Sequence, residues 1–177
     1  MATTTMTMTM ASVEQVWTWL AEVPDPEIPV ISVVDLGIVR VVELDGAHCT
    51  VTITPTYSGC PAMQVIADAI EAGLKSHGIT QLTMKTQLSP AWTTDWMSAE
   101  GKNKLRAYGI APPAQQVIDI SRISGSFARS KIAEPQVACP HCGSSKTRCS
   151  SHFGSTPCKA LYRCDDCLEP FDYFKCH

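Results

Sequence analysis

The chain has 177 residues, of which 45% are apolar and 18% are charged, and its formal net charge is -3. This composition is typical of one compact domain with a smaller appendage, and it excludes wholesale disorder, a collagen-like repeat and a strongly basic nucleic-acid binder. Residues 1–110 hold 6 basic and 11 acidic side chains, a net charge of -5. The acidic character of residues 1–110 argues against binding to the phosphate backbone of a nucleic acid, because such affinity comes from clustered Lys and Arg.

The N-terminal residues 1–11 are rich in Thr and Met and carry neither a basic region nor a continuous apolar core. We therefore expect a disordered N-terminus and no secretory signal. No apolar run approaches the about 20 residues of a membrane span. These features predict a soluble, cytoplasmic protein with no nucleic-acid or membrane partner, in which cysteines are thiols or metal ligands instead of disulfides.

The first third of the chain predicts a helix and a β-hairpin. Apolar residues recur at helical spacing over 13–20, and Ser12 is available as the N-cap. Three prolines within 24–29 prevent this helix from continuing. A β-branched run over 38–44 and alternation over 48–54, separated by an Asp-Gly turn signal, indicate an antiparallel pair of strands.

The middle third predicts a helix, a strand and a shorter helix. The helix is expected over 61–77, because Pro61 suits the first helical position and Gly78 can end it. A strand over about 80–88 and a helix over about 98–108 follow. The resulting order, α-β-β-α-β-α, is that of a small α/β sandwich with a mixed sheet.

This topology should bring three loops to one edge of the sheet. If the strand–helix–strand unit is parallel with a right-handed crossover, the loops 54–61 and 89–97 leave the sheet at the same edge. The loop 25–37 enters the hairpin at that edge too, because the strand it feeds runs antiparallel to the next one. We therefore expect these three loops to converge.

Two Cys-x-x-Cys turns dominate the last part of the chain, which holds seven of the nine cysteines. Cys139 and Cys142 are separated from Cys164 and Cys167 by 21 residues. Two such turns complete a tetrahedral four-sulfur site, and zinc is the metal that this pattern favours, with a rubredoxin-like iron site or a redox dithiol as alternatives. Four protein ligands make the site closed and structural, so metal should supply much of the stability of residues 135–177.

The predicted fold class is α+β, a small α/β sandwich followed by a C-terminal zinc-ribbon β-hairpin domain. The surplus cysteines leave two interpretations open: Cys158 and Cys176 are either small buried side chains or a second, labile thiol site for iron or a cluster. The expected domains are the disordered N-terminus over 1–11, the α/β domain over 12–112, a linker over 113–134 with an edge strand near 117–123, and the zinc ribbon over 135–177.

Cys60 is the candidate reactive thiol. As the N-cap of the expected 61–77 helix, its sulfur would face free backbone N–H groups and the positive end of the helix dipole, which would lower the thiol pKa. Gly59 leaves the approach to the sulfur open. The alternative is a partly buried cysteine without a role, and sequence spacing does not decide between the two.

Acidic, polar and aromatic residues lie on the same three loops as Cys60. The acidic ones are candidate oxygen ligands or partner contacts, with turn and cap chemistry as the alternative. The aromatic ones are either exposed recognition residues or side chains packed inward. These residues are Asp25, Glu27, Asp35, Thr94 and Asp95, together with Trp92 and Trp96.

Seven segments together resemble a known family. They are 25–29, 34–39, 54–61, 92–97, 153–156, 158–164 and 169–176. The first three resemble the α/β domain of metal–sulfur cluster assembly factors, and with the others the chain resembles, over about 12–177, the D-subunit family of phenylacetyl-CoA epoxidase systems.

The resemblance implies an accessory protein of aerobic phenylacetate degradation, where a di-iron oxygenase epoxidises the CoA-activated ring and a flavin and iron–sulfur reductase supplies electrons. By this resemblance the chain would assemble or deliver a metal centre, such as the reductase's [2Fe–2S] cluster. Cys60 would be the reactive cysteine, and Asp25 and Glu27 its acidic loop. The implied cofactors are structural Zn²⁺ and a transient iron or iron–sulfur cluster. The implied partners are reductase or oxygenase subunits, with a homodimer left open.

Three other functions are alternatives. A stoichiometric structural subunit of the oxygenase complex would carry out no transfer chemistry. A thiol-dependent hydrolase or transferase would need a His/Asp pair that the sequence does not tie to Cys60, so we assign no catalytic residue. A nucleic-acid-binding ribbon is disfavoured, because residues 135–177 hold 5 basic and 4 acidic side chains and four zinc-bound thiolates would make them negative.

Overall fold

The computed structural model describes residues 11–57, 59–113 and 135–175. It divides into two compact units, one ending at Lys104 and the other beginning at Leu105. The disorder expected before residue 11, the edge strand expected near 117–123 and the thiol of Cys176 lie outside the described residues. Within the described part, no helix combines the length and apolar character that crossing a bilayer requires.

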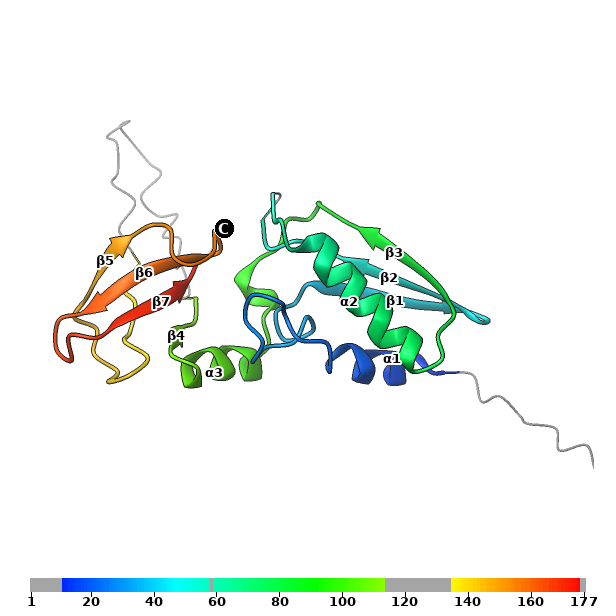
Figure 1. Cartoon of the computed structure of the whole chain (residues 1–177), viewed down its shortest axis with the longest axis horizontal. Helices are drawn as coiled ribbons and strands as arrows, with labels where there is room; N and C mark the ends of the chain where they lie inside the picture. The colour runs from blue at the N-terminus through cyan, green and yellow to red at the C-terminus, as the bar shows by residue number, and fades with distance from the viewer. Residues whose placement is uncertain (1–10, 58, 114–134, 176–177) are drawn as a thin grey trace, which may run out of the picture. The chain divides into compact units, whose positions relative to one another are not determined.

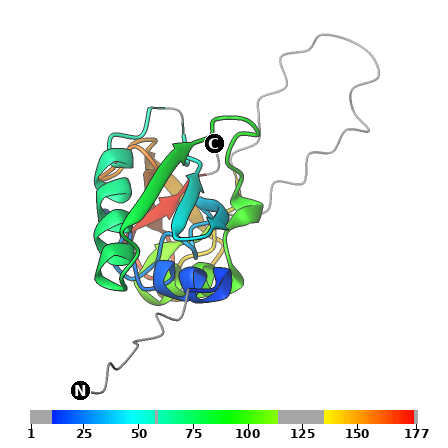
Figure 2. The ribbon, with the colours of Figure 1, turned by 90° about the vertical axis from the view of Figure 1, so that its right-hand side faces the viewer.

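The first unit is built on a three-stranded sheet in the order β1-β2-β3 (Figure 1). β1 and β2 pair antiparallel, and β2 and β3 pair parallel, as the sequence predicts. Figures 1 and 2 show α2 lying along one face of this sheet. The elements are α1 (Val13–Leu20), β1 (Val39–Asp45), β2 (His48–Ile53), α2 (Met63–Ser76), β3 (Gln81–Thr86), the 3-10 turn η1 (Thr94–Trp96) and α3 (Ala99–Ala107).

Alternation along β2 places one set of side chains in the core. Cys49, Val51 and Ile53 are all buried, as the sequence predicts. The helical spacing of α2 buries Ile66, Ile70 and Leu74. Because such burial removes apolar surface from water, these two stripes stabilise the unit.

The two helix starts differ in how well the sequence predicts them. α1 has the expected cap, because Ser12 accepts the N–H of Gln15 while the Gln15 side chain accepts the N–H of Ser12. α2 begins at Met63 with Ala62 as its N-cap, two residues later than predicted. A turn closed by the Cys60 N–H on the Tyr57 carbonyl comes first and delays the helix.

The second unit is a four-stranded sheet in the order β4-β7-β6-β5. β4 runs parallel to β7, and the other neighbours pair antiparallel. The C-terminal hairpin is thus confirmed, and the sheet also takes in Ile110–Ala111, which the sequence places in the preceding domain. Gly109, with a φ of 89°, turns the chain out of α3 into that strand. The strands are β4 (Ile110–Ala111), β5 (Thr147–Ser151), β6 (Lys159–Cys164) and β7 (Pro170–Phe174).

Candidate metal centre and the Cys60 loop cluster

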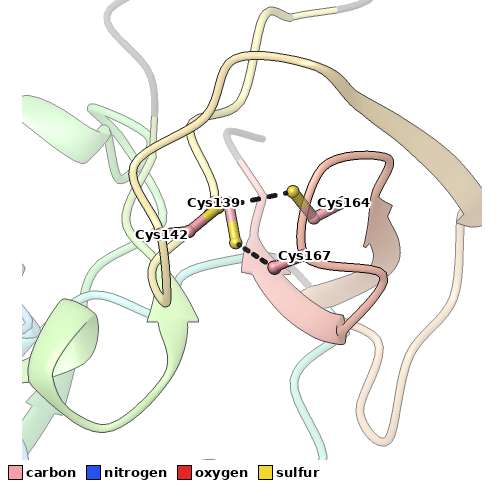
Figure 3. Close-up of side chains that lie close together, drawn as sticks. All are labelled: Cys139, Cys142, Cys164 and Cys167. Carbon is pink, nitrogen blue, oxygen red and sulfur yellow. Dashed lines mark hydrogen bonds between the residues drawn. The ribbon is translucent and has the colours of Figure 1, made fainter.

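Four cysteine sulfurs of the second unit meet at one point. Cys139 and Cys142 come from the loop before β5, Cys164 ends β6, and Cys167 lies in the turn between β6 and β7 (Figure 3). All four sulfurs lie within 4.8 Å of one another. The Cys139 and Cys167 sulfurs are 3.7 Å apart, and those of Cys142 and Cys164 are 3.6 Å apart.

These spacings fit a tetrahedral metal ion. A Zn²⁺ ion with Zn–S bonds of about 2.3 Å holds its sulfurs about 3.8 Å apart. Four soft thiolates also suit zinc or iron better than a hard cation. The two turns therefore form one metal-binding site, with no carboxylate or imidazole in the set.

Backbone hydrogen bonds shape the two turns. In the first, the Gly143 N–H donates to the Cys139 carbonyl at 2.9 Å, and the Cys139 N–H donates to the Ser144 carbonyl at 2.9 Å. In the second, the Cys164 N–H donates to the Glu169 carbonyl at 3.0 Å. These bonds fix the shape of each turn, so that both cysteines of a turn point to the same side.

The environments of the four thiols differ. The Cys167 N–H donates to the Cys164 sulfur and lowers the pKa of that thiol to about 7. Although the Glu169 N–H lowers the pKa of Cys167, burial and the neighbouring thiols outweigh it and raise that pKa to about 12. A metal ion must therefore displace protons from this site when it binds.

Cys149 and Cys158, the other cysteines in the described part of the ribbon, do not join this group. Cys158 is 4% exposed, and its sulfur lies 3.0 Å from the Thr156 hydroxyl oxygen. Cys149 is half-buried, with its sulfur 3.9 Å from Nδ1 of His152. For Cys158 the structure favours the role of a small buried side chain, and the second thiol site stays without support among the described residues.

Cys60 lies in the first unit and is half-buried. The Ala62 N–H and the Tyr57 hydroxyl both donate to its sulfur. Burial raises the thiol pKa above its ordinary value, and the charges of Glu27 and Asp25 raise it further, more than these two donors lower it. The predicted low pKa is therefore wrong, because the sulfur is partly buried and the acidic loop lies close.

The two acidic residues near Cys60 differ in their surroundings. Asp25 is 5% exposed, and its Oδ1 accepts the N–H groups of Glu27 at 2.9 Å and Ile28 at 2.8 Å. This is the turn chemistry that the sequence leaves as an alternative, and it shapes the loop that carries Glu27. Glu27 is half-buried and more accessible than Asp25.

Asp35 anchors the same loop to the start of α3. Its carboxylate accepts the Ser98 hydroxyl at 2.8 Å and the Lys104 ammonium at 2.8 Å. Burial alone would raise the pKa of Asp35, but the hydrogen bonds from Lys104, Ser98 and Ser32 lower it below its usual value. Sequence reasoning missed Ser98 and Lys104, since neither stands in a recognisable motif.

The aromatic loop packs inward. Trp92 is 3% exposed, and its Nε1–H donates to the Leu36 carbonyl at 3.0 Å. The Arg40 guanidinium lies 3.4 Å from the centre of the half-buried Trp96 ring. Gly37, with a φ of 73°, lies so close to the Trp96 backbone that a Cβ would collide with it. Trp92 is therefore packed inward, whereas the Trp96 ring, beneath Arg40, keeps part of its surface accessible.

The convergence of the three loops is confirmed. The 25–37 loop contacts the 89–97 loop through Trp92 and Trp96. The charges of Asp25 and Glu27, on the 25–37 loop, raise the pKa of Cys60 on the 54–61 loop. Thr94 is half-buried and Asp95 is exposed on η1. The structure thus brings Cys60, Asp25 and Glu27 together, while Asp35 serves as an anchor.

Two family models match the chain. One describes an iron–sulfur cluster assembly protein and matches residues 13–79. The other describes the PaaD zinc beta ribbon domain and matches residues 124–175. The first match covers α1 to the end of α2, including Cys60, and the second covers all four cysteines of the metal centre.

Three similar proteins cover one or both of these parts. A protein of Escherichia coli K12, named as the D subunit of a "Putative 1,2-phenylacetyl-CoA epoxidase", is 46% identical over 96% of this chain and 96% of its own length. An "Fe-S protein maturation auxiliary factor" of Porphyromonas gingivalis is 36% identical over 52% of this chain and 89% of its own length. A crystal structure of a domain of unknown function, DUF59, from Bacillus anthracis is 26% identical, covers 52% of this chain and 89% of its own, and has a TM-score of 0.49.

An iron–sulfur assembly domain with its loop cysteine, followed by a four-cysteine ribbon, is the arrangement that the resemblance predicts. Because the identity to the Escherichia coli protein spans nearly the whole of both sequences, the chain belongs to the D-subunit family of phenylacetyl-CoA epoxidases.

Proposed function

We propose that this protein is an accessory factor of a phenylacetyl-CoA epoxidase system that assembles or delivers an iron–sulfur or other metal centre to the reductase or the oxygenase. The observation that carries the proposal is the placement of Cys60 beside Asp25 and Glu27, in a unit other than the one that holds the four-sulfur site. The thiol of Cys60 would thus bind the transferred metal transiently, while the four-cysteine site would hold a resident ion.

The acidic neighbours of Cys60 suit a cationic cargo. Burial, together with the charges of Glu27 and Asp25, raises the thiol pKa and so favours the protonated, uncharged thiol. The same two carboxylates attract Fe²⁺ to the loop, since the field that disfavours a thiolate favours a cation. When Fe²⁺ binds, Cys60 releases its proton to solvent and the iron–sulfur bond forms, so loading makes the net charge of the loop one unit less negative.

We assign Zn²⁺ to the four-sulfur site as a structural ion. Cys139, Cys142, Cys164 and Cys167 would hold it, and no open position is left for a substrate. The ion would fold the ribbon, and the ribbon would then dock the client protein. A cytoplasmic location is part of this proposal, because both thiol groups must stay reduced.

The test is cluster occupancy of the reductase. The reductase is purified anaerobically from cells that express it with the unaltered chain, with Cys60→Ala or with the matched control Cys149→Ala, and its iron content and visible absorption are measured. We expect Cys60→Ala to lower occupancy several-fold and Cys149→Ala to leave it unchanged. Full occupancy with Cys60→Ala would refute the transfer role.

A stoichiometric structural subunit is the second candidate, and the word "subunit" in the name of the Escherichia coli relative favours it. This function predicts stable co-purification with the oxygenase core at a fixed ratio, together with full epoxidase activity from Cys60→Ala. The same set of variants therefore separates the two functions.

A further inference from the structure

β3 is a free edge of the first sheet among the described residues, since the sheet ends at β1 on one side and at β3 on the other (Figure 1). The other edge strands are protected from pairing with a further chain. β1 has a bulge between Val39 and Val41, β5 has one between Cys149 and Ser151, and β4 is two residues long. β3 has neither kind of protection, because it pairs with β2 in one unbroken register over Gln81–Thr86.

The backbone of β3 offers hydrogen-bonding groups on its outer side. Directly after the strand, the Gln87 N–H donates to the Ile53 carbonyl of β2 at 2.8 Å and therefore points towards β2. Because these groups alternate in direction along a strand, the N–H and carbonyl groups of Leu82 and Met84 point away from β2. No described strand pairs with them there. An unpaired row of this kind is a template for a further strand.

The side chains of β3 present an apolar and a polar face at this edge. Leu82 and Met84 share a face with the buried side chains of β2, but they are themselves only half-buried. The apolar core therefore reaches the open edge of the sheet. On the other face lie Gln81, Thr83 and Lys85, of which the first and last are exposed. A strand that covers this edge must match both faces.

We propose that β3 pairs antiparallel with β3 of a second copy of this chain, about a two-fold axis that passes through Thr83. Leu82 then lies opposite the partner's Met84, and the two residues exchange both of their backbone N–H···O bonds. On the polar face, Gln81 lies opposite the partner's Lys85, so that the amide oxygen accepts a hydrogen bond from the ammonium group. Every residue thus meets a compatible partner, and the two sheets join into one. This inference does not rest on the function proposed for Cys60.

Lys85 and the two faces of the strand favour this register over other pairings of β3 with itself. In a parallel pairing in register, Lys85 would lie beside the partner's Lys85, and like charges placed directly opposite destabilise a strand pair. An antiparallel register centred on Met84 would place Leu82 opposite the partner's Thr86, and so would match the apolar face less well. An antiparallel register shifted by a single residue would oppose the apolar face to the polar one. Of these pairings, the register centred on Thr83 matches both faces.

The experiment is sedimentation velocity of the full chain over a range of protein concentrations. A single strand pair buries little surface, so we expect a reversible dimer with a dissociation constant in the micromolar range. Thr83→Lys places two ammonium groups face to face on the axis and should weaken the dimer about 10-fold or more. Gln81→Glu places a carboxylate opposite each partner's Lys85 and should tighten the dimer about 2- to 10-fold.

Val41→Lys is the matched control, because Val41 is exposed on β1, at the opposite edge of the same sheet. It should leave the dissociation constant unchanged. Gln81→Glu changes an exposed side chain at the start of β3, so it tests the register even if Thr83→Lys impairs folding.

A cross-link tests the register directly. Thr83→Cys brings two sulfurs together in a non-hydrogen-bonded pair, whose Cα atoms lie about 4.5 Å apart and thus within the range for a disulfide. We expect oxidised glutathione to link the two introduced sulfurs, as identified by peptide mass spectrometry. Lys85→Cys should give no such link, because its two copies lie about 14 Å apart along the strand. The proposal is overturned if the chain is monomeric at every concentration, as it would be if another segment of the same chain covered β3, or if Thr83→Lys and Gln81→Glu leave the dimer unchanged.

Discussion

Gly143 and Leu168 occupy equivalent places in the two halves of the metal centre. Each is the residue after the second cysteine of its Cys-x-x-Cys turn, and each has a left-handed backbone, with φ of 77° at Gly143 and 66° at Leu168. Glycine adopts this conformation without steric cost, whereas for leucine the left-handed backbone costs about 1 kcal/mol of conformational energy. The two turns therefore share one backbone shape, and only the second turn is strained.

Replacing Leu168 by glycine should stabilise the metal-loaded ribbon by about 1 kcal/mol. Leu168 is 60% exposed, so its loss removes little apolar contact. The measurement is the denaturant midpoint of the ribbon amides by NMR, with Gly143→Ala as the counterpart that should destabilise by a similar amount. Equal midpoints for Leu168→Gly and the unaltered chain would show that the strain is absent.

Replacing Cys142 by serine should release the metal and unfold the ribbon while the first unit stays folded. The four sulfurs act as one ligand set, and a small sheet of this size depends on its ion. All four tryptophans precede residue 105, so tryptophan fluorescence follows the first unit alone.

We expect the fluorescence melting curve of the Cys142→Ser protein to match that of the unaltered chain, and its metal content to fall to near zero. Cys149→Ser is the matched control, because its sulfur lies outside the ligand set. Retained metal with dispersed ribbon amides in Cys142→Ser would contradict the assignment.

The sequence predicted the parts of this molecule that depend on period and spacing. Alternation from Cys49 to Ile53 set the register of the central strand, and the spacing of the cysteine pairs set the metal centre. The convergence of the loops followed from topology alone. These features are local patterns, and such patterns can be read without coordinates.

The sequence did not predict the features that depend on the exact start of a helix or on a partner far away in the chain. The turn at Tyr57 delays α2. Burial and the charges of Glu27 and Asp25 reverse the expected direction of the Cys60 pKa shift. The partner of Asp35 is Lys104, which is 69 residues away and carries no motif. The unpaired hydroxyl of Thr54 depends on what surrounds it, which no pattern of residue types shows.

Alkylation of Cys60 should be slow at pH 7 and rise about tenfold per pH unit towards pH 9, because burial and the charges of Glu27 and Asp25 raise the thiol pKa. Glu27→Gln removes one of these charges, lowers the pKa and should speed alkylation at pH 8 about 2- to 5-fold. The measurement is iodoacetamide labelling followed by peptide mass spectrometry.

Glu43→Gln is the matched control for the alkylation experiment, because Glu43 is exposed on β1 and belongs to none of the three loops. A labelling rate that is already constant between pH 6 and 8 would mean that the thiol is ionised at rest. That outcome would favour the helix-dipole effect over the acidic loop.

Replacing Asp35 by asparagine should destabilise the first unit by about 2 kcal/mol at pH 7, because it removes charged hydrogen bonds to Lys104 and Ser98. The folded pKa of Asp35 is lowered, so its contribution is fully present above the pKa of the unfolded chain and is lost as the pH falls through the folded value. Urea unfolding followed by tryptophan fluorescence at pH 7 and at pH 3 measures the difference. The gap between Asp35→Asn and the unaltered chain should narrow at pH 3, while Asp95→Asn, on an exposed side chain, should change little at either pH. An equal difference in unfolding free energy at pH 7 and at pH 3 would show that the substitution destabilises the unit through packing and not through charge.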